Sequence, residues 1–170
     1  MRTRAPWLLV GPFLLGARPT KASLVGGAVV AIAGLLVRGW AAGCLDKGGA
    51  LAVDGPYAFT RNPLYLGSFV IGVGVAAAGG HWIWPAVFVA GFTLLYVPTM
   101  RHESAELLAR YGPAYRDYAT RVPSFIPHMA ARRPLRRVDG SFTWSRYLRY
   151  REWEAALGVA AALGVLALKL

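Results

Sequence analysis

Long runs of apolar residues, each separated from the next by a polar or basic segment, dominate the pattern of this sequence. The runs cover residues 22–37, which can extend toward residue 45, then 64–79, 82–100 and 153–168. A helix rises 1.5 Å per residue, so crossing a hydrocarbon core about 30 Å thick takes roughly 20 residues. Several runs therefore need flanking residues to complete a crossing, and the pattern predicts a bundle of membrane helices.

A shorter apolar stretch from Pro6 to Gly16 is interrupted by Gly11 and Pro12. Its basic start, apolar run and small-residue end are similar to a secretory signal peptide, but we interpret it as a retained first membrane segment. It either forms a kinked span over 3–20 or enters and leaves on one side. Counted as a crossing, it gives the predicted fold class: all-α, a polytopic membrane helix bundle of about five transmembrane helices, in one domain over residues 1–170.

The composition and the distribution of charge support this prediction. Of the 170 residues, 56% are hydrophobic and the net charge is +11, while the mean hydropathy is +0.42. Basic residues gather in 38–61 and 101–151, whereas the connection at 79–81 has no lysine or arginine. Cytoplasmic loops carry an excess of both residues, so the two basic segments are expected on the cytoplasmic side of a bacterial-type inner membrane.

Several classes of function lack their usual sequence signals. The single cysteine, Cys44, excludes an internal disulfide and a cysteine-built metal cluster, and we expect it to be a small buried residue. The sequence has no Gly-x-Ser-x-Gly, Walker-type or His-Glu-x-x-His motif. Acyl-enzyme hydrolysis, nucleotide hydrolysis and zinc proteolysis are therefore not indicated.

After residue 100 the pattern changes from apolar to amphipathic. Good helix formers over 101–110 predict a helix that continues out of the membrane and ends at Gly112. A second short helix is predicted over 113–121. Three tyrosines share one face of this region: Tyr111, Tyr115 and Tyr118. A helix resting on lipid headgroups would show the same pattern and stays an alternative interpretation.

The run "ARRPLRRVDG" at 131–140 carries four arginines. Such a run suits anionic lipid headgroups, at roughly 1 kcal/mol per charge near the surface. A nucleic-acid partner is not expected, because the run has no aromatic stacking platform around it. The sequence leaves the oligomeric state open.

A cluster of ionisable residues lies where the run 82–100 leaves the predicted membrane: Arg101, His102, Glu103 and Glu106. Charges at that depth usually face a water-filled cavity or pair with one another, so the cluster is a candidate site. Two helical glutamates beside a histidine are also typical of carboxylate metal sites. However, His81 and His128 are predicted far from the cluster, and no metal site is expected.

Several segments occur in a fixed order: "GPYAFTRNPLYLG" at 55–67, a helical hairpin, a glutamate-bearing exit helix, and "LLARYGPAYRDYATRVPSFIP" at 107–127. Together they resemble the isoprenylcysteine carboxyl methyltransferase and phospholipid methyltransferase group of integral membrane enzymes. The resemblance covers 55–127 and leaves an extra C-terminal membrane helix at about 153–169. It implies that S-adenosylmethionine binds at the cytoplasmic face and that a lipid-like or hydrophobic acceptor arrives from the bilayer.

The loop motif of that family, typically Arg-His-Pro-x-Tyr-x-Gly, falls here on Asn62, Tyr65 and Gly67. Asparagine replaces the histidine; it still donates and accepts hydrogen bonds but carries no charge, so less pH-dependent cofactor binding is expected. The paired glutamates of the family fall on Glu103 and Ser104. The second acid is therefore missing, and a glutamate one turn on, at position 106, is a candidate substitute.

The resemblance also implies roles for individual residues. Glutamate can meet the ammonium group of the cofactor and arginine its carboxylate, with charge-assisted hydrogen bonds. We therefore predict Glu103 and Arg101 as the catalytic residues, with Arg101 also suited to an anionic acceptor. Arg121, which matches the family's Arg-Val-Pro, is predicted to close the pocket. The predicted cofactor-binding residues are Asn62, Tyr65, Leu66, Gly67, Arg101, Glu103, Tyr115, Tyr118 and Arg121.

Two local contacts are predicted as well. Asn62 is expected to cap the N-terminus of the helix that follows it. At the start of the last apolar run, Glu152 and Glu154 are expected to pair with the neighbouring Arg149 and Arg151, with contact to the pocket as the alternative.

The favoured function is O-methylation of an isoprenylcysteine-type carboxylate, which needs no base. A phospholipid amine is an alternative acceptor, whose proton Glu103, Glu106 or His102 could take. Small hydrophobic thiols or acids fit the same resemblance. A non-enzymatic membrane protein that binds anionic lipid is a separate alternative, and a membrane reductase or metal enzyme is another.

Overall fold

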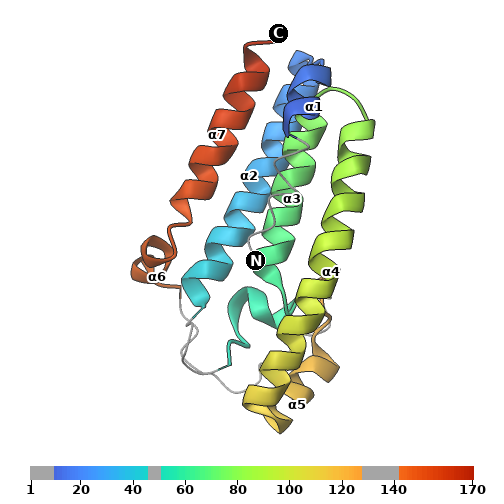
Figure 1. The fold of residues 1–170 in the computed structure, drawn as a ribbon. Helices are drawn as coiled ribbons and strands as arrows, with labels where there is room; N and C mark the ends of the chain where they lie inside the picture. Colours follow the sequence, from blue (N-terminus) through green and yellow to red (C-terminus); the bar gives the residue numbers. More distant parts are fainter. Residues whose placement is uncertain (1–9, 46–50, 128–141) are drawn as a thin grey trace.

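The computed structural model describes residues 10–45, 51–127 and 142–170. Within these ranges it contains helices and no strand, which confirms the all-α prediction. Figure 1 shows how the elements are arranged. In chain order they are α1 (Val10–Gly16), α2 (Lys21–Cys44), the 3-10 turn η2 (Gly55–Ala58), α3 (Pro63–Ala78), α4 (Ile83–Tyr111), α5 (Pro113–Arg121), α6 (Trp144–Arg149) and α7 (Trp153–Ala167).

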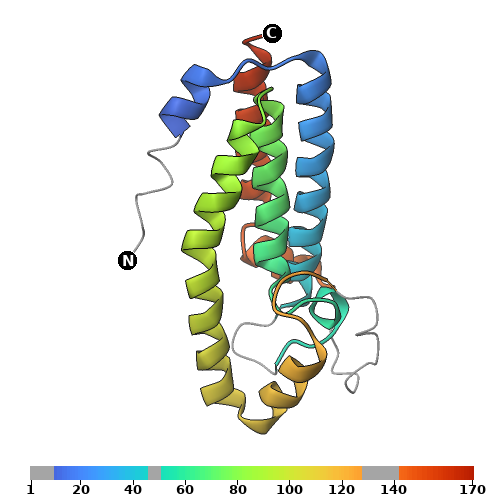
Figure 2. The ribbon, with the colours of Figure 1, turned by 90° about the vertical axis from the view of Figure 1, so that its right-hand side faces the viewer.

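Four helices, α2, α3, α4 and α7, run side by side along the length of the molecule (Figure 1, Figure 2). Helices α2 and α3 form the central pair, α4 packs on α3, and α7 contacts both α2 and α3. A Cβ added at Gly34 would lie 2.6 Å from the Ile71 nitrogen, and one at Gly74 would lie 2.5 Å from the Ala31 nitrogen. These glycines therefore let the two backbones approach closely, as in membrane bundles whose helices associate through small residues.

The surface of the bundle is apolar. Helices α2 and α4, with 24 and 29 residues, are long and apolar enough to cross a membrane by length and composition, while α3 and α7 are shorter apolar helices. Four large apolar residues of α2 are exposed by 52% to 70%: Val25, Val29, Ile32 and Leu36. Their helical spacing places them on one outward face. An exposed apolar stripe of this kind is typical of a surface that meets lipid, which indicates a membrane protein.

The first expected span is represented by α1, whose 7 residues make a helix about 10 Å long. It lies at the end of the bundle where α3 turns into α4 and where α7 finishes (Figure 1). The ring of Phe13 packs on Trp84 at the start of α4, with ring centroids 5.3 Å apart. The Lys169 ammonium donates to the Leu14 and Ala17 carbonyls at 2.5 and 2.8 Å. Within the described residues α1 covers one end of the bundle and does not cross it.

The opposite end of the bundle holds the polar elements η2 and α5. Helix α4 continues past the apolar run and stops at Gly112, which has a φ of 55°, and α5 begins at Pro113 as predicted. Tyr115 and Tyr118 are buried in a cluster with Val122. Protein thus covers the tyrosine face of α5, which does not support a helix resting on lipid headgroups. The arginine-rich run at 131–140 and His128 lie outside the described residues.

Candidate functional site

The stretch from 55 to 67 forms one wall of the polar end. Gly55, with a φ of 59°, starts the turn η2, and Pro63 occupies the first turn of α3 behind Asn62. The position of Asn62 was predicted correctly, but its capping hydrogen bond was wrong. The side chain makes no cap, and its Nδ2 instead donates to the Ser124 carbonyl at 2.8 Å. That carbonyl belongs to the segment after α5, so the hydrogen bond ties the two segments together.

Tyr65 and Glu103 meet between α3 and α4. The Tyr65 hydroxyl donates to Oε1 of Glu103 at 2.7 Å, and its ring packs against Tyr96 with ring centroids 5.4 Å apart. Both are half-buried. Two of the residues predicted from separate segments therefore lie together, with the carboxylate held by a phenol.

The rest of the ionisable cluster on α4 turns outward. Arg101 is exposed, and Nε2 of His102 lies 3.3 Å from Oε1 of Glu106, with both side chains mostly exposed. Arg101 and Glu103 are two residues apart on a helix and so point in nearly opposite directions. Of the four candidates, Glu103 is the one whose side chain reaches into the bundle.

The two predicted tyrosines of α5 support other residues. The Tyr118 hydroxyl donates to the Tyr57 carbonyl at 2.8 Å, and Nη1 of Arg61 donates to the Tyr115 hydroxyl at 3.4 Å. Each tyrosine is 3% exposed. Their contacts hold Tyr57 within the turn η2 and Arg61 just after it.

Tyr57 and Arg61 each carry a buried polar atom without a hydrogen-bond partner among the described residues: the Tyr57 hydroxyl and the Arg61 Nε. Burial raises the pKa of the Tyr57 phenol, and the negative charges of Glu152 and Glu103 raise it further. The hydroxyl therefore stays protonated and available as a donor. A buried donor left unpaired costs about 1–3 kcal/mol, so these two atoms mark a place where a polar ligand would be stabilised. Neither residue was predicted from the sequence as part of the site.

The remaining predicted residues are placed as follows. Gly67 is packed against α2, since a Cβ there would lie 2.7 Å from the Arg38 Cβ. Leu66 is half-buried on α3. Arg121 is half-exposed and pairs with Asp117 on its own helix, with Nη2 2.5 Å from Oδ1. Their predicted contacts with a cofactor stay predictions.

A cavity of about 510 Å³ lies beside this polar end, between α3, α4 and α7 with α1 at its far end. Its volume is within the range of small-molecule sites. The walls are mostly apolar: Val10, Phe13, Ile71, Gly72, Val75, Ala76, Trp84, Val87, Phe88, Gly91, Phe92, Leu95, Ala155, Gly158 and Val159. Arg38, Ser68 and Tyr96 also line it. Tyr96 packs on Tyr65, so the cavity adjoins the Tyr65–Glu103 pair.

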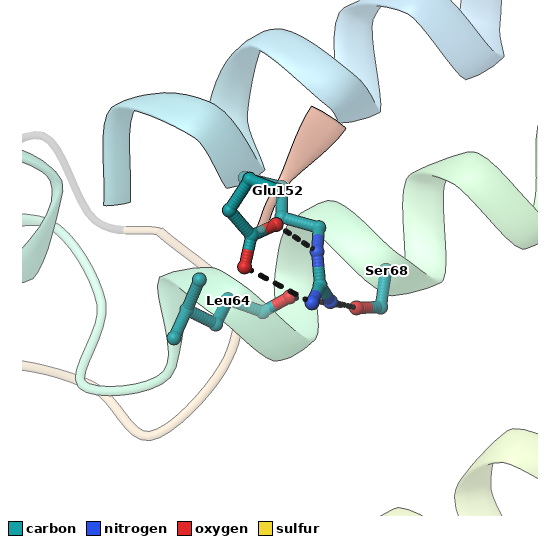
Figure 3. A network of polar contacts seen from close by, with 4 residues as sticks. Leu64, Ser68 and Glu152 are labelled. Carbon is teal, nitrogen blue, oxygen red and sulfur yellow. Dashed lines mark hydrogen bonds and ion pairs between the residues drawn. The ribbon is translucent and has the colours of Figure 1, made fainter. Parts of the chain in front are cut away.

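An ion pair between Arg38 and Glu152 closes the wall between α2 and α7. Nε of Arg38 lies 2.6 Å from Oε2 of Glu152, and Nη2 lies 3.3 Å from Oε1. Nη1 also donates to the Ser68 hydroxyl, which itself donates to the Leu64 carbonyl at 2.9 Å. Figure 3 shows this network, with Leu64, Ser68 and Glu152 labelled. Glu152 is 8% exposed.

The predicted partners of the two glutamates were half right. Glu154 pairs with Arg151, as expected, but the pairing of Glu152 with a neighbouring arginine was wrong. The chain turns at Arg151, which has a φ of 54°, and Glu152 then lies inside the bundle while Arg151 is exposed. Arg38 could have been found, because an arginine inside an apolar run is a site candidate by default.

No family model and no solved structure matches the sequence. Several curated proteins are similar over part of the chain. A nickel-cobalt-cadmium resistance protein, NccN, of Alcaligenes xylosoxydans xylosoxydans is 37% identical over 84 residues, which are 49% of the chain and 39% of that protein. A protein-S-isoprenylcysteine O-methyltransferase of Schizosaccharomyces pombe is 30% identical over 82 residues, 48% of the chain and 35% of that protein.

The third relative is methanethiol S-methyltransferase 2 of Bradyrhizobium diazoefficiens, 33% identical over 79 residues, which are 45% of the chain and 29% of that protein. The chain thus spans 29% to 39% of the length of these relatives. They include two methyltransferases, which supports methyl transfer in general, and one protein named for metal resistance. Among the described residues no group of three histidine, cysteine or acidic side chains is placed to hold a metal ion.

Proposed function

We propose that this chain is an integral membrane methyltransferase that moves a methyl group from S-adenosylmethionine to a hydrophobic acceptor. The observation that carries the proposal is the hydrogen bond between Tyr65 and Glu103 beside the apolar cavity. This hydrogen bond lies where the proposed cofactor site meets the cavity that would hold an apolar acceptor. The similarity to an isoprenylcysteine O-methyltransferase and a methanethiol S-methyltransferase supports the same reaction class.

The donor set at the polar end fits the polar groups of S-adenosylmethionine. Glu103 offers a carboxylate to the ammonium group, at charge-assisted strength. The unpaired Nε of Arg61 and the hydroxyl of Tyr57 are buried donors suited to the carboxylate and the ribose hydroxyls. Arg61 is half-buried whereas Arg101 is exposed, so Arg61 is the better carboxylate ligand. Arg101 and Arg121 lie on the exposed side of this end, where they would close over the bound molecule.

The residues contribute mainly by alignment and by excluding water. S-adenosylmethionine, when bound, supplies an electrophilic methyl group on a positively charged sulfur. Tyr65 fixes the Glu103 carboxylate, and the aromatic and aliphatic walls of the cavity hold an apolar acceptor against the polar end. Holding two reactants in the productive geometry lowers the activation free energy by several kcal/mol, and by about 7–11 kcal/mol in the best cases. A carboxylate or thiolate acceptor needs no base, whereas an amine would have to lose a proton first.

The membrane placement follows the distribution of basic residues. Arg38, Arg61 and the arginines of α5 lie at the end that carries the candidate site. We place this end at the cytoplasmic face of an inner membrane, by the excess of lysine and arginine in cytoplasmic segments. The five-span topology, with residues 3–20 as the first crossing, is part of this proposal.

Isothermal titration of the protein in lipid nanodiscs with S-adenosylmethionine tests the proposal. Saturable binding is expected, and Glu103→Gln should weaken it at least tenfold because the charge-assisted contact to the ammonium is lost. Glu154→Gln is the matched control, since Glu154 is exposed and pairs with Arg151, and it should bind like the wild type. The alternative of a non-enzymatic lipid-binding protein predicts no saturable binding in any variant.

The acceptor class is tested separately. Membranes are incubated with a radiolabelled methyl donor, and the labelled lipid, protein or small-molecule fraction identifies the product. Base-labile label indicates an ester and therefore a carboxylate acceptor, while label in an amine headgroup would favour the phospholipid alternative.

A further inference from the structure

Arg38 is the charged side chain in the wall of the cavity, among the described residues that line it. It lies within α2, the second helix of the chain, outside the segment on which the resemblance depends. Its side chain is 31% exposed, whereas that of its partner Glu152 is 8% exposed. Glu152 is thus enclosed by protein, and the guanidinium forms the accessible part of the pair.

A purely structural role explains the pair poorly. Burying two charges costs desolvation energy that their attraction often fails to offset, and apolar side chains of similar volume hold helices together as well. A guanidinium has five N–H donors in a fixed fork. The Arg38 guanidinium donates three hydrogen bonds to Glu152 and Ser68. Its other N–H groups can therefore donate to a further partner. A clamp that fixes a guanidinium at the wall of a cavity suits a binding role.

The position of Arg38 relative to Glu103 is also suited to such a role. Ser68, which accepts from Arg38, follows Tyr65 by three residues on α3, so the two side chains lie on one face of that helix. Tyr65 donates to Glu103. In addition, the charges of both Glu152 and Glu103 act on the Tyr57 phenol. The Arg38 clamp and the proposed cofactor site are therefore adjacent.

We propose that Arg38 binds the anionic head group of the acceptor, a carboxylate on a single hydrophobic chain that lies in the cavity. Glu152 and Ser68 are positioning residues that hold the guanidinium. The inference rests on the proposed function and narrows its acceptor. A carboxylate matches the planar fork of arginine with two parallel hydrogen bonds, and the apolar walls suit the chain. An ammonium head group would be repelled by the guanidinium.

Binding of three probes with one chain length tests the inference without any methyl donor. Dodecanoate, dodecanol and dodecylamine are titrated calorimetrically into the protein in nanodiscs of zwitterionic lipid. Dodecanoate is expected to bind at least tenfold more tightly than the alcohol, and the amine most weakly. The same titration in discs that contain phosphatidylglycerol asks whether a lipid phosphate takes the site. Loss of dodecanoate binding there would overturn the assignment to a carboxylate.

The double variant Arg38→Gln with Glu152→Gln removes both charges but keeps two side chains that can hydrogen-bond to each other. It avoids the uncompensated buried charge that would remain after a single substitution. It should bind dodecanol like the wild type and lose the preference for dodecanoate. The control is Arg151→Gln with Glu154→Gln, which removes an exposed ion pair near the same helix end and should keep the preference.

Two further results would overturn the inference: equal binding of dodecanoate and dodecanol by the wild type, or a carboxylate preference that survives in the double variant. The melting temperature of each variant shows whether it is folded. Since the probe titrations contain no S-adenosylmethionine, failure of the cofactor to bind would remove the proposed function through a different measurement.

Discussion

Two buried phenols at the polar end show how differently one side chain can be used. The Tyr118 hydroxyl donates to the Tyr57 carbonyl at 2.8 Å, whereas the Tyr57 hydroxyl has no partner among the described residues. Burial raises the pKa of both phenols, which therefore remain protonated donors. One hydroxyl stabilises the fold, and the other is free to bind a ligand.

Replacing each tyrosine by phenylalanine separates these roles. Tyr118→Phe should lower the free energy of unfolding by about 1 kcal/mol, because it removes a buried hydrogen bond and leaves a carbonyl unpaired. Tyr57→Phe should raise the free energy of unfolding by about 1–3 kcal/mol, because it removes a buried donor that has no partner among the described residues, yet weaken S-adenosylmethionine binding several-fold. Denaturation and calorimetry on the two variants provide the measurements. Unchanged cofactor affinity in Tyr57→Phe would remove this residue from the site.

At the same scale, the sequence could predict some contacts and not others. Tyr65 and Glu103 lie in the segments that carry the family resemblance, which predicted both of them as cofactor-binding residues. The structure shows that they form a hydrogen bond. Arg38 and Glu152 are 114 positions apart, and no local pattern joins them. The predicted partner of Glu152 was wrong, because the prediction used the arginines next to it in the sequence. The turn at Arg151 instead places Glu152 inside the bundle.

Among the elements, the helices with strong local signals were predicted well. Helix α5 matches its predicted range from Pro113 to Arg121, because Gly112 and Pro113 fix its start and Pro123, two residues past its end, disfavours helix in the residue before it. Helices α3 and α7 differ from their apolar runs by about one residue at the ends. The expected first span carried the weakest signal, and the described part of it is the short helix α1.

The packing of α2 on α3 predicts opposite effects at two neighbouring glycines. A Cβ at Gly27 would lie 2.5 Å from the Gly74 carbonyl and 2.6 Å from the Ala78 nitrogen, whereas one at Gly26 meets nothing within 4 Å. Gly27→Ala should therefore destabilise the protein by about 1–3 kcal/mol, since backbone atoms cannot move aside cheaply. Gly26→Ala should be neutral or slightly stabilising, because alanine is the better helix former.

Thermal unfolding in one detergent measures both glycine variants. Equal melting temperatures for the two would contradict the close approach of α2 and α3.

On the scale of the whole molecule, the cavity depends on the assembly of the helices. Its walls come from segments that lie far apart in the sequence, including Phe13, Phe88 and Val159. Periodicity identifies each helix but not which faces of three helices surround one space. The composition could therefore predict a membrane bundle, while the cavity proposed to hold the acceptor could be found only from the tertiary arrangement.

Filling the cavity from α7 should block the acceptor without affecting the cofactor. Gly158 lines the cavity, and a Cβ there meets nothing within 4 Å, so Gly158→Phe adds a ring into open space. Dodecanoate binding should fall at least tenfold, with unchanged affinity for S-adenosylmethionine. Gly164→Phe is the matched control on the same helix, because Gly164 has equal space but does not line the cavity. Equal dodecanoate binding by both variants would mean that the chain of the acceptor lies elsewhere.

The link between Arg38 and Glu152 also bears on how the molecule is made. Synthesis proceeds from the N-terminus, so the arginine of α2 reaches the bilayer while its counter-ion, 114 residues later, has not yet been translated. An arginine at the centre of a membrane helix costs about 2.5–3.5 kcal/mol during insertion, and less near a helix end where the side chain reaches the interface. Charge neutrality at this point is reached only when α7 docks. Completion of the proposed acceptor site is thus tied to the last step of biogenesis, and a chain arrested before α7 lacks the counter-ion of Arg38 near the end of α2.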